Sequence, residues 1–129
     1  MKKTSNKNAS QYVYKQMEFK ANNLSGEIIH STDINAKPPR TNKLYVVKSY
    51  GYYPVFIYSY QTGNWYETED RYSITTAKQM SQVRPTGAQV IKHAYMEALI
   101  RHPQQEVKIV GGASVSLSKY EETIKELSS

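Results

Sequence analysis

The sequence predicts an α+β fold, in which a small, mainly antiparallel sheet (a three-stranded meander plus a short hairpin) packs against two or three helices. An aromatic-rich segment over residues 44–70 alternates in polarity and is interrupted twice by turn residues, which is typical of a meander. After Tyr72 the pattern changes to capping boxes and helical spacing. Because the strands are grouped before the helices, an antiparallel sheet is favoured over a parallel one.

The three strands of the meander are expected at Leu44–Tyr50, Pro54–Tyr60 and Trp65–Asp70. Apolar and polar residues alternate along the first of them, as in a strand with one buried face. Gly51 separates the first strand from the second. The turn between the second and third strands contains Gly63, which can adopt the positive φ that such hairpin turns require.

Residues 1–43 are expected to form a basic, partly flexible N-terminal arm, and residues 44–129 are expected to form the α+β domain. The arm holds eight lysines and arginines and three acidic residues, so it carries +5 of the chain's net charge of +6. Such a charge is attracted to phosphate or to an acidic protein surface. A solvated tail that only aids solubility explains the same charge equally well.

Two segments of the arm have weaker patterns. Gln11–Lys20 fits either a strand or a helix, and the strand is favoured. Leu24–Asn42 is expected to be a loop, because Gly26 and the pair Pro38-Pro39 interrupt regular structure.

The second half of the chain is expected to be mainly helical. One helix begins at Thr75 or Thr76, where Thr76 and Gln79 form a capping box. A second helix is expected at about Ala88–Arg101, and Pro103 stops it. The remaining elements are the hairpin strands Val107–Val110 and Val115–Leu117 around Gly111-Gly112, and a last helix from Ser118.

The composition excludes several classes of site. The chain has no cysteine, which excludes disulfides, thiolate zinc sites and a cysteine nucleophile and favours a reducing, cytoplasmic setting. No phosphate loop and no nucleophile–base pair is recognisable, so neither an enzyme nor a cofactor is predicted. His93 and Glu97 have metal-like spacing, but a surface ion pair is favoured because no third ligand is near in sequence. The acidic residues Glu67, Glu69 and Asp70 are interpreted as a solvated rim.

The candidate binding residues are exposed aromatic and basic side chains. Tyr52 and Tyr53, beside Gly51, are expected at an exposed loop tip, where large aromatics often make contacts. The tyrosines could also stack on unpaired bases, but core and cross-strand packing is favoured for most of them, since no RNA-binding signature is present. The basic candidates are Lys15, Lys20, Lys37, Arg40, Lys43, Lys48, Arg71, Lys78 and Arg84.

The segments Tyr45–Gly51 and Tyr72–Gln82 resemble a small domain of unknown function found in phage and plasmid accessory proteins. In that family a strand ending in Ser-Tyr-Gly leads to a hairpin and then to Tyr-Ser-Val-Thr-Thr-x-Lys-His-x-Ser. Here Gln79 stands where histidine is usual, and the aromatic insert after Gly51 is longer. The resemblance covers Tyr45–Arg84 and implies a mobile genetic element as the source. Small cysteine-free proteins of such elements often inhibit host defences, including CRISPR nucleases.

The sequence-based hypothesis is therefore a non-enzymatic binding protein that inhibits a host defence nucleoprotein, with a CRISPR–Cas9 effector as the favoured partner. A basic protein does not mimic duplex DNA, so contact with guide RNA or an acidic protein face is expected. The alternative is a small DNA- or RNA-binding regulator. Residues 77–101 have helix-turn-helix spacing, although Val90 and Ile91 fit packing better than reading of a DNA groove.

Overall fold

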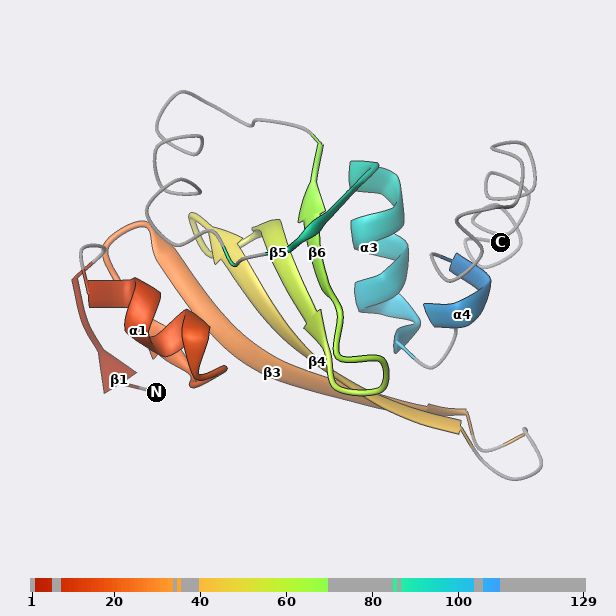
Figure 1. Ribbon diagram of the computed structural model, residues 1–129. Helices are drawn as coiled ribbons and strands as arrows, with labels where there is room; N and C mark the ends of the chain where they lie inside the picture. The colour runs from red at the N-terminus through yellow and green to blue at the C-terminus, as the bar shows by residue number, and fades with distance from the viewer. Residues whose placement is uncertain are drawn as a thin grey trace.

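The computed structural model describes residues 2–5, 8–33, 35, 40–69, 85, 87–103 and 106–109, and it confirms an α+β fold with a mainly antiparallel sheet (Figure 1). Within these described residues, seven strands follow one another in sequence order across the sheet. The pairs from β2 to β6 are antiparallel, whereas β1 pairs with β2 and β6 with β7 in parallel. The elements are β1 (Lys2–Lys3), α1 (Ala9–Tyr14), β2 (Phe19–Lys20), β3 (Leu24–Asp33), β4 (Arg40–Ser49), β5 (Tyr53–Ser59), β6 (Trp65–Thr68), β7 (Gln89–Ile91), α3 (His93–Arg101) and α4 (Glu106–Ile109).

The predicted meander is confirmed as β4, β5 and β6. Gly63 has a φ of 73° in the turn between β5 and β6, as the turn chemistry requires. Between β4 and β5 the chain turns through Tyr50 and Gly51, with φ values of 55° and 78°. The register of β4 and β5 shifts between Val47 and Lys48, which marks a β-bulge.

The sheet is larger than predicted, because residues 24–33 and 40–42 of the loop expected over Leu24–Asn42 form strands. β3 pairs with β4 along ten residues, from Leu24 opposite Ser49 to Asp33 opposite Arg40. Gly26 is not a breaker: a Cβ there would meet the Tyr45 hydroxyl and would lie 2.6 Å from the Phe19 ring. A glycine inside a strand often marks such a close approach. The sheet therefore includes residues on both sides of the expected boundary between the arm and the domain.

Three other predicted elements differ from the structure. The favoured strand over Gln11–Lys20 is instead the end of helix α1 followed by β2. The second helix begins at His93 rather than Ala88, because Gln89–Ile91 pairs with β6. Of the strand expected at Val107–Val110, residues 107–109 are helical in α4, and Val110 lies outside the described residues. In each case contacts distant in the sequence outweigh a weak local preference. The helix expected from Thr75 or Thr76, the turn at Gly111-Gly112, the strand Val115–Leu117 and the helix from Ser118 lie outside the described residues.

The core has two parts, one on each face of the sheet. Alternation along β4 sends Tyr45 and Val47 to one face and Leu44 and Val46 to the other. Helix α1 covers the first face, and α3 and α4 cover the second (Figure 1). The first cluster is Ala9, Val13, Phe19, Ala21, Leu24, Tyr45, Val47, Val55 and Phe56. The second cluster is Leu44, Val46, Ile57, Tyr66, Tyr95, Met96, Ala98, Leu99 and Ile109.

Glu106 anchors the short helix α4 to the sheet. Its side chain is buried, with 1% of the residue exposed, and its carboxylate accepts hydrogen bonds from four side chains. A carboxylate is acceptor-only with about four lone-pair sites, so four donors match its capacity. The donors are Asn42 Nδ2 at 2.8 Å, the Ser59 hydroxyl, Thr62 Oγ1 at 2.9 Å and Tyr66 Oη at 2.5 Å.

The bond from Tyr66 to Glu106 predicts how stability depends on alkaline pH. Burial and the hydrogen bond to Glu106 raise the pKa of Tyr66 from 10.0 to about 12. The folded state therefore favours the neutral phenol, and this stabilisation is complete below pH 10 and is lost as the pH rises through about 12. We expect Tyr66→Phe to be less stable than the wild type by about 1–3 kcal/mol at neutral pH, and the difference to shrink above pH 10.

The measurement is the free energy of unfolding in urea at neutral pH and across the alkaline range. Tyr14→Phe is the matched control, because Tyr14 is 82% exposed and its phenol is not buried in the fold. A difference between the wild type and Tyr66→Phe that stays constant up to pH 12 contradicts the assignment.

Candidate functional site

An exposed group of aromatic rings with one lysine lies on the sheet face that α1 covers in part. We call Lys43, Tyr58, Tyr60 and Trp65 the aromatic strip. The Tyr58 ring lies 5.1 Å from the Tyr60 ring at 89° and 5.1 Å from the Trp65 ring at 56°. The Lys43 ammonium lies 4.5 Å from the centre of the Tyr60 ring. The strip therefore joins aromatic surface and a cation within one patch.

Strand register brings these residues together. Tyr58 in β5 lies opposite Tyr45 in β4 and opposite Trp65 in β6. Directly opposite residues of an antiparallel pair share a face of the sheet. Tyr60 follows β5, and its backbone N–H donates to the Lys43 carbonyl at 3.1 Å. The strip is therefore built from three adjacent strands and not from one loop.

Burial differs along the strip. Tyr60 is 38% exposed and Lys43 is exposed, whereas Tyr58 and Trp65 are half-buried. Beneath them Tyr45 is fully buried, and its hydroxyl donates to the Met17 carbonyl at 2.7 Å. The Tyr45 ring meets the Trp65 ring edge-on, with 6.3 Å between their centres. A buried, hydrogen-bonded ring thus packs against the half-buried Trp65.

The environment of Tyr60 in the strip favours the neutral form of its phenol. Burial, with a smaller effect of the neighbouring Tyr58, raises the pKa of Tyr60 above its usual value of 10.0. Burial also raises the pKa of Tyr45. A cation over an aromatic face contributes about 0.5–1 kcal/mol at an exposed site. At neutral pH the strip offers phenol and indole faces beside one positive charge.

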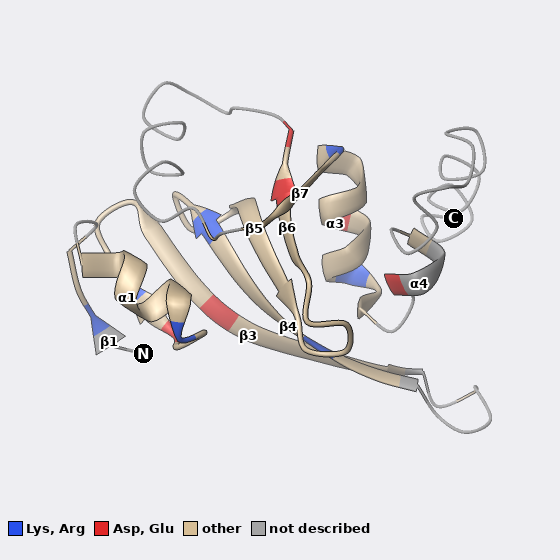
Figure 2. Cartoon of the chain, in the orientation of Figure 1, with Lys and Arg blue, Asp and Glu red and all other residues tan. Residues whose placement is uncertain are grey.

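The other predicted basic residues whose side chains the structure describes are Lys15, Lys20 and Lys48. Lys15 and Lys20 are exposed beside α1 and in β2. Lys48 forms an ion pair with Glu27 at 2.7 Å on the face that α3 and α4 cover. Figure 2 shows basic residues distributed over β1, α1, β4 and α3. Arg40 begins β4, but its side chain is not described, and Lys37, Arg71, Lys78 and Arg84 lie outside the described residues.

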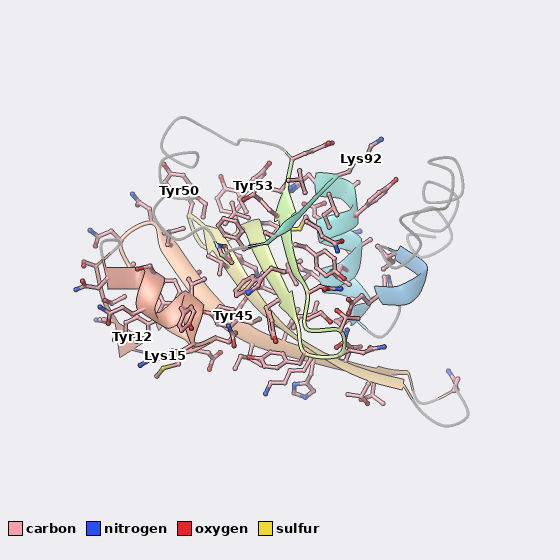
Figure 3. All side chains as sticks on the ribbon, in the orientation of Figure 1. Tyr12, Lys15, Tyr45, Tyr50, Tyr53 and Lys92 are labelled. Carbon is pink, nitrogen blue, oxygen red and sulfur yellow. The ribbon has the colours of Figure 1, made fainter. Side chains whose placement is uncertain are left out.

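The two tyrosines expected at a loop tip are in different environments. Tyr52 is 58% exposed. Tyr53 is half-buried at the start of β5, and its ring stacks on His93 with 4.3 Å between centres and 9° between planes. In Figure 3, Tyr53 lies toward β7 and α3, whereas Lys15 lies beside α1. The expectation that both rings are exposed is wrong for Tyr53, because the tertiary fold places the start of α3 against it.

His93 joins α3 to the sheet. Its Nε2 lies 3.3 Å from a Glu97 carboxylate oxygen, so the expected contact between these residues is confirmed. Its Nδ1 lies 3.2 Å from Thr68 Oγ1. Among the described residues no group of three or more histidines and acids could hold a metal ion. Glu67 is buried, so its assignment to a solvated rim is wrong, because the strand register places it opposite Phe56 of the core.

The described part of the chain contains no helix with the length and apolar character to cross a bilayer.

The three rings of the strip were present in the sequence only as members of an aromatic segment. Their alternation was the available signal, because Tyr58 and Tyr60 are two residues apart and a four-residue turn leads to Trp65. The position of Lys43 opposite Tyr60 could not be read without the register of β4 and β5.

Comparison with known proteins finds no matching family model, no matching curated protein and no matching solved structure. The resemblance to a phage and plasmid domain therefore stays a prediction. Any functional conclusion rests on the geometry of this chain.

Proposed function

We propose that this chain is a non-enzymatic binding protein that contacts single-stranded nucleic acid through the aromatic strip. The observation that carries the proposal is the Lys43 ammonium over the Tyr60 ring, with Tyr58 and Trp65 adjoining on the same face. Proteins that bind single strands combine positive charge along the backbone with aromatic faces on which bases stack. The aromatic strip supplies both within one patch.

Unpaired bases fit this surface better than a duplex. In a duplex the faces of the bases are stacked on one another, so exposed protein rings cannot reach them. Each stacked base contributes about 1–3 kcal/mol, and every base has an aromatic face, so the contact tolerates different sequences. The net charge of +6 favours association with a polyanion.

The Cas9-inhibitor hypothesis stays a prediction that is compatible with this contact, since a guide RNA exposes unpaired bases. It expects co-purification of the chain with a Cas9–guide complex and reduced cleavage of target DNA. Unchanged cleavage without association rejects the inhibitor but leaves binding of free single strands to be judged by itself.

The charge on Lys43 gives the first test of the nucleic-acid contact. We expect Lys43→Ala to weaken binding of an oligonucleotide of about 12 nucleotides and to lower the slope of log affinity against log salt by about 0.7, because one phosphate contact is lost. Fluorescence anisotropy over a series of salt concentrations measures both quantities. Lys48→Ala is the matched control, since it removes the same charge from the opposite face, where Glu27 pairs with it. Equal effects of both variants contradict a site at the strip.

The ring of Tyr60 gives the second test. We expect Tyr60→Ala to weaken binding by about 1–3 kcal/mol, because a base loses its stacking partner. Tyr14→Ala removes an 82% exposed tyrosine from α1 and should leave the affinity within twofold or so of the wild type. Wild-type protein that binds neither single-stranded DNA nor single-stranded RNA, or that binds duplexes equally well, overturns the proposal. Capture of a nucleic-acid-free host protein would instead favour a protein partner.

A further inference from the structure

We infer that the buried carboxylate of Glu106 positions the aromatic strip from the opposite face of the sheet and thereby tunes its affinity for single-stranded nucleic acid. The part about affinity rests on the proposed function, whereas the part about position can be tested in the free protein. Glu106 does not belong to the strip, because it is buried on α4, whose Ile109 belongs to the core cluster of the other face. It is a positioning residue.

The donors to Glu106 and the members of the strip are neighbours in the chain. Successive side chains of a strand point to opposite faces, so a donor held on one face determines where the next side chain lies on the other. Asn42 precedes Lys43, Ser59 lies between Tyr58 and Tyr60, and Tyr66 follows Trp65. Every member of the strip is thus one residue away from a side chain that donates to the same carboxylate.

The fourth donor closes the turn between β5 and β6. Thr62 Oγ1 donates to Glu106 at 2.9 Å and also accepts the backbone N–H of Asn64 at 3.3 Å. The backbone N–H of Gly63 donates to the Ser59 carbonyl at 2.8 Å. This turn connects Tyr60 to Trp65, so its geometry sets the distance between the two ends of the aromatic surface. Glu106 therefore holds both the strands and the turn of the strip.

A carboxylate can accept all four of these hydrogen bonds, and the amide of a glutamine cannot. Both oxygens of Glu106 accept, one from Asn42 and Ser59 and the other from Thr62 and Tyr66. In Glu106→Gln one of these oxygens becomes an NH₂ group, which donates and cannot accept. If the NH₂ replaces the first oxygen, it faces the Asn42 amide nitrogen, which also donates; if it replaces the second, the Thr62 and Tyr66 hydroxyls must turn their protons away in order to accept from it. Either placement breaks existing hydrogen bonds and favours rearrangement. The nearest rearrangement moves the turn or β4, and with them the strip.

Trp65 makes the position of the strip measurable, because it is the only tryptophan in the chain. We expect Glu106→Gln to change the Trp65 emission maximum, its near-UV circular dichroism and its quenching by acrylamide in the absence of any ligand. Ile109→Val is the matched control: Ile109 is fully buried in the same helix, so the variant weakens the packing of α4 without removing an acceptor. If Glu106→Gln does not fold, Thr62→Val takes its place, because it removes one of the four donors. Its control is Thr41→Val, at an exposed threonine.

Binding of the same oligonucleotide completes the experiment. We expect Glu106→Gln, or Thr62→Val, to weaken binding on the order of tenfold, the effect of losing one base contact, while the control variants stay near the wild type. If Glu106→Gln folds and keeps both the Trp65 spectra and the affinity of the wild type, the inference is overturned and the proposed function stands. If the wild type binds no single strand, the proposed function is rejected. Changed Trp65 spectra in Glu106→Gln would then still support the positioning role. Equal spectral changes in Ile109→Val overturn the specific role of the carboxylate.

Discussion

One buried carboxylate ties together parts of this protein that the sequence keeps far apart. Glu106 accepts hydrogen bonds from side chains that lie 40, 44, 47 and 64 residues earlier in the chain. Those side chains come from β4, β5, β6 and the turn between the last two strands. A buried charge is tolerated only where its hydrogen-bonding capacity is filled, so the site constrains all four donors together. The docking of α4, the closure of the turn and the spacing of three strands depend on this one group.

The sheet separates anchoring from exposure. On one face, α3, α4 and Glu106 hold the strands from within a covered core. On the other face, the rigid Tyr45 ring supports Tyr58 and Trp65, and Tyr60 with Lys43 reaches solvent. A rigid scaffold that presents a few exposed rings limits the conformational entropy lost on binding. Under the proposed function, this division places the contact surface on one face of the sheet and its anchoring on the other.

The elements that the sequence predicted well are those specified by neighbours in the chain. Alternation and the glycine of a tight turn predicted β4, β5, β6 and the connection at Gly63. The prediction failed at β3, where Gly26 looked like a breaker although it provides room for the Tyr45 ring. It also failed at α4, where the alternation of Val107 and Ile109 suggested a strand but Glu106 and Ile109 face the core from a helical turn. In both places the deciding contact is with a residue that is distant in sequence.

Periodicity, turn chemistry and composition act over a few residues, so the α+β class, the meander, the positive charge and the supply of tyrosines could be predicted without coordinates. Long-range packing was needed to show which tyrosines stay exposed, which lysine lies beside them and which lysine pairs with Glu27. Those outcomes depend on strand register and on which face of the sheet a helix covers. Strand register and the covering of each face by helices are determined by burial and hydrogen bonds between residues distant in the sequence. The four hydrogen bonds to Glu106 are the clearest example.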